Sequence, residues 1–400
     1  MVMVLIMLDE LWNSTLVRPG EYMVRLGSWS RKYMFNRLVE SIEKRLAREG
    51  FNTKIIAYEP RIIIIDPKPS NKLFDILGHI FGISSFSPAI QLDFSLRKIL
   101  DSIIEITSLL DIDSFAVRVI RGDAPISSRG LAKELSDKVA YRTGLRIDLD
   151  KPDIEIKVEI RRRKVYVYTE EILGPGGLPY GVEGCLISLV SGGVDSAVAS
   201  VLAMKRGVKI IPLFVDLYPY WGEKAIMRAY RSLELLYKWV PWYDMEAYII
   251  RNASEPLLEL KIPAGIRCIA CKAIMYRYAF KLSQKIGCRG IVTGESIGQV
   301  ASQTLNNMSV LTMLSPIPVY RPVAFMDKLE IIELGRRMGF SELDVDVGKC
   351  HLRPSHPTIS IGEKELVILS KELERIDHII TRVLDNNLEE IVFPKTSRGP

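Results

Sequence analysis

The pattern of hydrophobic and polar positions changes near the middle of the chain. After residue 182, short aliphatic runs alternate with segments whose apolar residues recur at a helical period. The predicted strands are 185–190, 208–216, 246–250 and 290–294, with helices between them. Regular alternation of strand and helix predicts a doubly wound parallel sheet covered by helices on both faces, which is an α/β domain.

The first half of the chain mixes the two periods. Helices are predicted at 35–50 and 127–144, a hairpin at 53–66, and strand-like alternation at 115–120 and 154–170. This mixture is typical of small α+β modules. Four glycines and two prolines in residues 174–181 predict a turn-rich linker between the two halves.

Composition places the chain among folded multidomain proteins. It has 400 residues, 48% of them hydrophobic and 26% charged, and domains usually have about 100–200 residues. The longest aliphatic run, residues 62–65, is too short for a membrane span. The apolar start of the chain lacks a basic region and reaches Asp9 and Glu10 too early for a signal peptide, so we expect a cytoplasmic protein.

The net charge of +6 does not identify a binding partner, but two local windows of the sequence are strongly basic. Residues 25–48 contain seven basic and two acidic side chains, and Arg161–Lys164 is an uninterrupted basic run. Such windows can bind phosphates, although an ordinary solvated surface is the commoner interpretation of such charge.

Residues Ser191–Ser196 form the segment SGGVDS between a predicted buried strand and a predicted helix. Backbone N–H groups and the helix dipole make an anion site at such a junction, and paired glycines let a phosphate approach the backbone. A Gly-Gly turn can also be purely structural. Neither the Walker pattern nor GxGxxG occurs. The hexamer resembles the pyrophosphate loop (PP-loop) of the ATP-pyrophosphatases, which implies that Asp195 helps to hold Mg²⁺ on the pyrophosphate of ATP.

Four further segments, in order along the chain, extend this resemblance: 81–88, 174–184, 293–307 and 321–332. Together they resemble the tRNA 4-thiouridine synthetases (tRNA uracil 4-sulfurtransferases), in the short archaeal-type form without a rhodanese domain. The resemblance implies three regions: a ferredoxin-like domain (1–78), a THUMP RNA-binding domain (79–173) and a PP-loop catalytic domain (174–360). Residues 361–400 match no part of the family pattern, and their amphipathic period predicts a C-terminal helical extension.

The resemblance also implies site residues. Lys328 matches the family's catalytic lysine, although an exposed lysine at a helix start is the plainer interpretation. The residues placed at ATP are Leu189, Val190, Ser191, Gly192, Gly193, Asp195, Ser196, Phe214, Val215, Lys272, Gly294 and Gln303. The basic residues expected at RNA are Arg25, Arg31, Lys32, Arg118 and Arg121. Residues 217–225 depart from the family pattern, so adenine contacts there stay open.

Five cysteines, an odd number, make a disulfide framework unexpected. Cys268 and Cys271 form a CxxC at a helix start, where thiol pKa values are lowered, and Cys350 lies in a loop of turn formers. These three residues could bind zinc with His351 or His356 as a fourth ligand, or an iron–sulfur cluster (3Fe–4S or 4Fe–4S) with an open iron. A thioredoxin-like motif is a further alternative. Similarity to archaeal-type members favours the cluster, with catalytic roles for all three cysteines. Cys185 and Cys288 are interpreted as small core residues.

The expected activity, by resemblance, is adenylation of the C4 oxygen of a tRNA uridine at position 8, followed by its replacement with sulfur. The sulfur would come from sulfide or from a cysteine desulfurase persulfide. Two alternatives stay open: a PP-loop ligase or amidotransferase-type synthetase acting on another substrate, and a catalytically silent tRNA-binding protein. A homodimer and a side role in thiamine synthesis are also left open.

Overall fold

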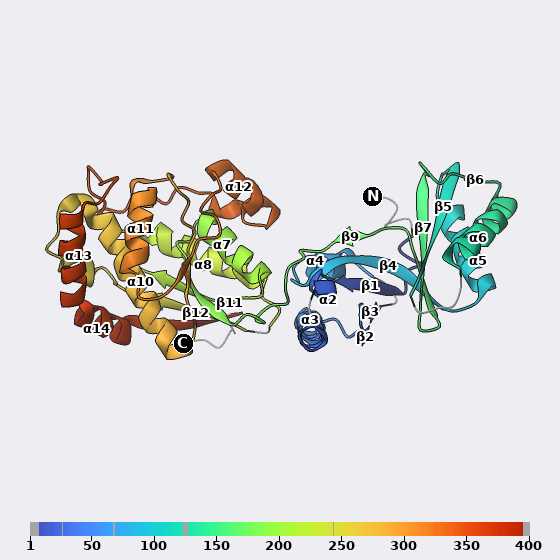
Figure 1. Cartoon of the computed structure of the whole chain (residues 1–400), viewed down its shortest axis with the longest axis horizontal. Helices are drawn as coiled ribbons and strands as arrows, with labels where there is room; N and C mark the ends of the chain where they lie inside the picture. Colours follow the sequence, from blue (N-terminus) through green and yellow to red (C-terminus); the bar gives the residue numbers. More distant parts are fainter. Residues whose placement is uncertain (1–7, 26, 67–68, 123–126, 243, 395–400) are drawn as a thin grey trace. The chain divides into compact units, whose positions relative to one another are not determined.

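The chain folds into two compact units, residues 1–178 and 179–400, in the computed structural model shown in Figure 1. The structure describes residues 8–25, 27–66, 69–122, 127–242 and 244–394. The division between the units falls within the glycine- and proline-rich segment 174–181. Within the described residues, every helix is too short or too polar to cross a membrane.

The first unit contains one mixed sheet with helices packed on it. Among the described residues its strands follow the order β2-β3-β1-β4-β8-β7-β5-β6, with β9 paired to β4. The strands are β1 (Ser14–Pro19), β2 (Lys54–Tyr58), β3 (Arg61–Ile65), β4 (Ile83–Asp93), β5 (Ser114–Arg121), β6 (Arg146–Ile147), β7 (Ile154–Arg161), β8 (Lys164–Tyr168) and β9 (Ile172–Leu173). The helices are α2 (Tyr22–Arg25), α3 (Ser28–Arg48), α4 (Asn71–Leu77), α5 (Leu96–Ser108) and α6 (Ser128–Thr143).

Helix α3 shows why the sequence folds as predicted in this unit. Its buried apolar residues Phe35, Leu38, Ile42 and Leu46 recur every three or four positions, so they form one face against the sheet. The chain leaves the helix through Gly50, whose φ of +83° suits glycine. The predicted hairpin at 53–66 is confirmed as the antiparallel pair β2 and β3.

Strand β4 is shared by the two modules of the first unit. Its first part pairs with β1, where Ser14 lies opposite Ala89, and its second part pairs with β8, where Ile90 lies opposite Val167. One apolar core lies under α3 and α4, and a second lies under α5 and α6. The boundary expected after residue 78 falls just before β4, so the two segments on either side of it build one continuous sheet.

The second unit contains a six-stranded sheet in the order β14-β13-β10-β11-β12-β15, as far as the described residues show. The four predicted strands appear as β10 (Cys185–Leu189), β11 (Lys209–Val215), β12 (Met245–Ile250) and β13 (Ile291–Val292), and they are parallel. The remaining strands are β14 (Val319–Tyr320) and β15 (Leu388–Phe393). The helices are α7 (Val194–Lys205), α8 (Glu223–Tyr237), α9 (Glu255–Leu258), α10 (Arg267–Ile286), α11 (Leu305–Leu314), α12 (Lys328–Arg337), α13 (Glu363–Arg375) and α14 (Asp377–Asn387). Figure 1 shows α10, α11, α13 and α14 beside the sheet, with α7, α8 and α12 grouped together.

The segment after residue 360 contributes more than the expected helical extension. It forms α13 and α14, and then β15 pairs antiparallel with β12, with Met245 opposite Phe393. The sequence analysis missed this strand, because LEEIVF follows a helix directly and carries two consecutive acidic residues. The last segment therefore completes one edge of the sheet.

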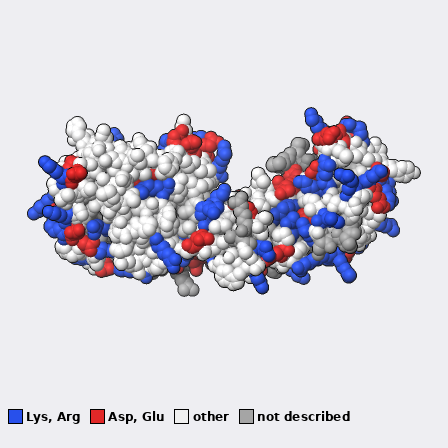
Figure 2. Space-filling view, viewed as in Figure 1, with Lys and Arg blue, Asp and Glu red and all other residues white. Residues whose placement is uncertain are grey.

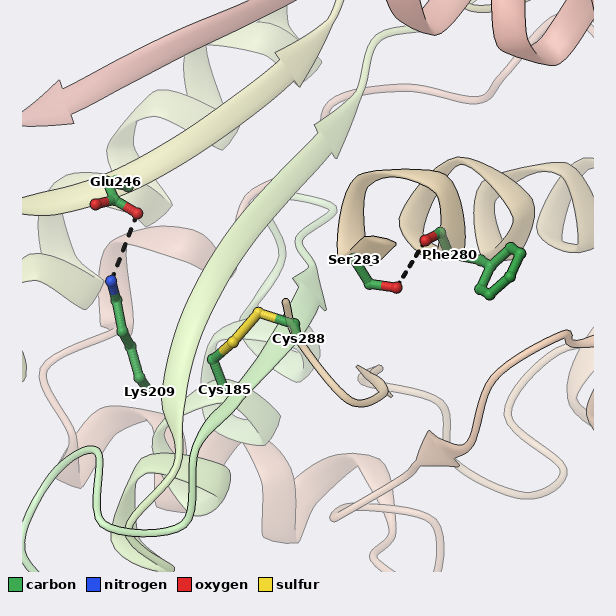
Figure 3. Close-up of a disulfide and its surroundings, with 6 residues drawn as sticks. All are labelled: Cys185, Lys209, Glu246, Phe280, Ser283 and Cys288. Carbon is green, nitrogen blue, oxygen red and sulfur yellow. Dashed lines mark hydrogen bonds and ion pairs between the residues drawn. A yellow bond between two sulfur atoms is a disulfide. The ribbon is translucent and has the colours of Figure 1, made fainter. Parts of the chain in front are cut away.

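Cys185 and Cys288 form a disulfide, which corrects their interpretation as unbonded core residues (Figure 3). Cys185 begins β10, and Cys288 lies in the loop that leads from α10 into β13. Because β10 and β13 are neighbours in the sheet, the two Cα atoms lie 4.8 Å apart although 103 positions separate them in sequence. That separation hid the pairing from any local pattern.

Reduction of this disulfide is expected to destabilise the second unit. A cross-link that closes a loop of about 100 residues stabilises a fold by about 4.7 kcal/mol, mainly by restricting the unfolded chain. In a domain of this size the loss lowers Tm by roughly 9–19 °C. Thermal unfolding with and without a thiol reductant measures the effect, and the Cys185→Ala, Cys288→Ala double variant serves as the control. The cross-link is excluded if reductant lowers the Tm of that variant equally, or if the native protein has five titratable thiols.

Candidate active site

The segment SGGVDS forms a tight loop between β10 and α7. Gly192 has a φ of +78°, and a side chain there would meet the backbone nitrogen of Ala229 in α8 at 2.7 Å. The Ser191 N–H donates to Ser196 Oγ at 3.1 Å, and the Ser196 hydroxyl donates to the Gly193 carbonyl at 3.0 Å. Since the N-cap of α7 is Gly193, no N-cap side chain occupies the first-turn N–H groups. The loop is therefore rigid and presents a helix N-terminus suited to an anion.

A second loop, which follows β13, lies directly against this helix start. A side chain at Gly294 would overlap the backbone of Asp195 and Ser196, so only glycine permits the contact. In the sheet, β10 has β13 on one side and β11 on the other, so the strand order reverses at β10. Ligands of α/β sheets usually bind at such a point, outside the carboxyl ends of the strands. The cavity between the loops has a volume of about 200 Å³. Its lining residues are Leu189, Ser191, Asp195, Ser196, Lys272, Met275, Tyr276, Thr293, Gly294, Glu295 and Gln303.

Asp195 and Lys328 form an ion pair at the edge of this cavity. Lys328 Nζ lies 2.6 Å from Asp195 Oδ1, and the amide of Gln299 donates to Asp195 Oδ2 at 3.0 Å. Lys328 is the first residue of α12, whose N-cap Asp327 forms a capping box with Glu330. The helix start thus brings a residue 133 positions away onto the loop. Lys328 therefore belongs to the site and is more than a lone surface lysine.

Glu295 organises the opposite side of the cavity. This carboxylate is buried and accepts from Lys272 Nζ at 2.6 Å, from the Tyr276 hydroxyl at 2.6 Å and from Arg321 Nε at 2.8 Å. Burial alone would raise the pKa of Glu295, but the charge of Lys272 and the hydrogen bonds outweigh it and lower the pKa to about 2. Glu295 is therefore ionised and holds the Lys272 ammonium at the cavity wall.

Glu295, Tyr276, Gln299 and Arg321 were not among the predicted site residues. Glu295 and Gln299 lie within the segment 293–307 on which the family resemblance depends, so that motif could have indicated them. Conversely, Val190, Phe214 and Val215 were predicted at ATP but are buried in the core and absent from the cavity lining. Gly192 and Gly193 act through their backbone.

The three cysteines Cys268, Cys271 and Cys350 line a second cavity of about 320 Å³. Ser191, Lys272 and Met275 line both cavities, so the thiols lie next to the nucleotide loop. The loop that carries Cys350 folds back onto the segment before α10, where the Thr358 N–H donates to the Gly265 carbonyl at 2.9 Å. A side chain at Gly265 would meet Thr358 Oγ1 at 2.6 Å, which explains a glycine there.

The expectation that the helix start lowers both CxxC pKa values is wrong for the free thiols. Burial raises the pKa of Cys268, and burial together with the nearby Cys350 and Cys268 raises the pKa of Cys271 to about 12. Desolvation of a thiolate thus outweighs the helix terminus and the nearby Lys272. The uncomplexed thiols of Cys268 and Cys271 are therefore protonated.

The histidines do not join the cysteines. His351 and His356 are exposed and absent from the cavity lining. Within the described residues, no three His, Cys, Asp or Glu side chains already converge as a metal-binding group. The three thiols therefore line one cavity without already forming a metal-binding group, and neither histidine lines that cavity as a fourth ligand.

The predicted RNA residues lie on two modules of the first unit. Arg31 and Lys32 are on α3, and Arg31 Nε donates to Glu59 at 3.1 Å. Arg118 and Arg121 are on β5, where Arg118 pairs with Glu155 at 3.0 Å and lines a cavity of about 560 Å³ together with Arg129 and Lys133. The side chain of Arg25 lies outside the described residues. The structure thus spreads these side chains over the unit.

The fold and the two loops define an ATP-pyrophosphatase-type nucleotide domain joined to a unit that carries two α+β modules. Residues 181–375 match the family "Thiamine biosynthesis protein (ThiI)", residues 99–170 match the THUMP domain, and residues 14–87 match the ThiI ferredoxin-like domain.

Named relatives and a solved structure agree with this class. The chain is 31% identical to the "Probable tRNA sulfurtransferase" of Thermococcus kodakarensis over 87% of this chain and 94% of the relative. It is 33% identical to that of Methanosarcina acetivorans over 90% of each. The "Crystal structure of a 4-thiouridine synthetase - RNA complex with bound ATP" superposes with a TM-score of 0.84 at 25% identity, over 95% of this chain and 99% of that one.

The protein belongs to the tRNA sulfurtransferase (ThiI) family. The family resemblance and the fold classes predicted from the sequence are thereby confirmed.

Proposed function

We propose that this protein is an ATP-dependent tRNA sulfurtransferase that converts a uridine, position 8 by family resemblance, into 4-thiouridine. One observation carries the proposal: the nucleotide cavity and the three-thiol cavity share Ser191, Lys272 and Met275. Activation by ATP and delivery of sulfur can therefore act on one C4 carbonyl group without a long transfer of the substrate. Membership of the tRNA sulfurtransferase family agrees with this activity.

In the first step the C4 oxygen of the uridine attacks the α-phosphorus of ATP, and the bond between the α- and β-phosphates breaks to release pyrophosphate. The loop N–H groups and the ammonium groups of Lys272 and Lys328 are placed to stabilise the charge that develops on the phosphates. Asp195 orients Lys328, and it has the carboxylate chemistry needed to hold Mg²⁺ on the pyrophosphate. In the second step a sulfur nucleophile attacks C4, and AMP leaves with the original oxygen.

The three cysteines suit an iron–sulfur cluster better than zinc. Their cavity lining contains no histidine or carboxylate as a fourth ligand, whereas three thiolates leave one iron of a 4Fe–4S cluster open. Such a cluster, when bound, supplies an open site for a sulfur ligand. Metal binding also deprotonates thiols whose pKa burial has raised. Sulfide, which completes the second step directly, would enter through this cavity. A desulfurase persulfide would first form a disulfide with C4, and a further thiol would have to cleave that disulfide to leave the sulfur on C4.

The first unit is the proposed tRNA-binding part. Structured RNA is recognised mainly through shape and backbone contacts, and this unit contains a THUMP match and two helix-covered modules on one sheet. The "4-thiouridine synthetase - RNA complex" covers almost the whole chain, which supports an RNA partner for this protein.

Two measurements on the purified protein test the proposal. Mass analysis of tRNA nucleosides after incubation with ATP and sulfide should show 4-thiouridine, and ATP–pyrophosphate exchange should depend on tRNA. A small-molecule ligase would show exchange without tRNA, and a silent binding protein would show none. Either result would reject tRNA thiolation as the activity.

A further inference from the structure

The turn between β7 and β8 carries two arginines in a backbone conformation that arginine rarely adopts. Arg161 pairs with Lys164, so Arg162 and Arg163 form a two-residue loop. Their φ angles are +44° and +66°. Two-residue hairpin loops with positive φ at both positions strongly favour Asn-Gly. Local stability does not explain two arginines here, and backbone outliers of this kind often mark functional positions.

A buried carboxylate next to this turn holds further arginines. Glu159 on β7 is fully buried and lies 2.7 Å from Arg61 Nε, 2.9 Å from Arg161 Nε and 3.9 Å from an Arg18 nitrogen. Arg18 also interacts electrostatically with Glu171. Two carboxylates therefore face these three arginines, which leaves an excess of one positive charge. The guanidinium groups are also oriented, because Arg61 and Arg161 both point Nε at the same carboxylate oxygen.

Neighbouring residues hold the turn in place. The Arg162 guanidinium lies 4.6 Å from the centre of the Tyr58 ring on β2, a cation–π geometry. A side chain at Gly122 would overlap Arg161, so this glycine leaves room for the guanidinium. The Arg163 side chain is exposed and forms no hydrogen bond or ion pair with another described residue. We call Arg61, Arg161, Arg162 and Arg163 the arginine surface.

We propose that the arginine surface binds backbone phosphates of the tRNA, in addition to the residues predicted from the sequence. The inference rests on the proposed function. Oriented guanidinium groups match phosphate oxygens in pairs, and excess positive charge attracts a polyanion. Figure 2 shows basic side chains gathered on the visible face of this unit, as binding to an extended polyanion requires. The same unit carries the THUMP match, which favours RNA over an acidic protein.

Charge reversal of the turn tests the proposal. The Arg162→Glu, Arg163→Glu double variant should bind tRNA at least about tenfold more weakly at low salt, with a salt slope reduced by about 1–2 because about two phosphate contacts are lost. ATP binding should not change. The matched control is the Lys364→Glu, Lys371→Glu double variant, which changes the net charge equally through two exposed lysines of α13.

A second variant separates RNA binding from a structural role. Arg162→Asn combined with Arg163→Gly supplies the residues that the turn conformation favours, so its Tm should equal or exceed that of the wild type. Its tRNA affinity should nevertheless fall. The proposal is overturned if this variant binds tRNA as tightly as the wild type, or if the charge-reversed variant matches its α13 control.

The two levels of inference fail in different ways. If the wild-type protein binds no tRNA, both the proposed function and the arginine surface are rejected. If the wild type binds and thiolates tRNA while both turn variants keep its affinity and salt slope, only the arginine surface is rejected.

Discussion

Replacement of Asp195 by alanine is expected to lower tRNA-dependent ATP–pyrophosphate exchange by at least about 10²–10³-fold. It removes the carboxylate that orients Lys328, and losing the action of one group that stabilises transition-state charge usually has an effect of this size. Asp195 holds Lys328 at 2.6 Å and accepts a hydrogen bond from Gln299 at 3.0 Å. Its side chain is partly exposed and contributes to no apolar core. The free energy of unfolding and the affinity for tRNA should therefore stay near their wild-type values. Exchange rates, thermal unfolding and tRNA titration measure the three quantities.

The partners of Asp195 supply the controls. Lys328→Ala should resemble Asp195→Ala, and the double variant should be little worse than either, because residues that act as one unit are not additive. Gln299→Ala should have a smaller effect, since it removes a neutral hydrogen bond from the same carboxylate. Near-normal thiolation by Asp195→Ala would remove this residue from the mechanism.

Replacement of Cys350 by serine is expected to abolish sulfur transfer while leaving ATP–pyrophosphate exchange within about twofold of the wild type. The thiol lines the cavity beside the nucleotide loop, whereas the groups proposed to contact phosphate are the loop N–H groups, Lys272 and Lys328. The same separation of activities is expected for serine at Cys268 or Cys271. Nucleoside analysis, exchange rates and the iron and acid-labile sulfide content of protein purified without oxygen measure the outcome.

The disulfide provides a matched control for these cysteine variants. The Cys185→Ala, Cys288→Ala double variant also removes cysteines from the second unit, yet neither residue lines the thiol cavity. It should lose thermal stability and keep its iron and its sulfur transfer. Colourless, fully active wild-type protein with stoichiometric zinc would refute the cluster, and full activity of Cys350→Ser would exclude that thiol.

The sequence predicted those parts of the fold that depend on local patterns. The alternation after residue 182 identified the parallel strands, and the hexamer at 191–196 identified the nucleotide loop, because each signal lies within a few neighbouring positions. The Glu295 network was missed because its partners Lys272 and Arg321 lie 23 and 26 positions away. A pattern within one segment cannot predict that one carboxylate will bind side chains from two other segments.

The cysteines show two other limits of sequence reasoning. The Cys185–Cys288 pairing depends on which strands become neighbours, and strand order is a property of the whole sheet. The CxxC lies at a helix start, as predicted, but its thiol pKa values are not lowered. Burial of Cys271 raises the pKa by more than the helix terminus lowers it. Cys350, which lies about eighty residues later in the chain, lines the same cavity and further raises the pKa of Cys271.

Strand β4 fixes the distance between the two modules of the first unit. It has eleven residues, a length of about 36 Å at about 3.3 Å per residue, and it is hydrogen-bonded into the ferredoxin-like module at one end and the THUMP module at the other. Neither module can swivel without breaking that ladder. The spacing between the two modules is thus set when the unit folds, so any RNA that binds both must match a fixed length. Two residues added to β4 would keep every side chain on its own face of the sheet and would lengthen the distance between the two modules by about 7 Å.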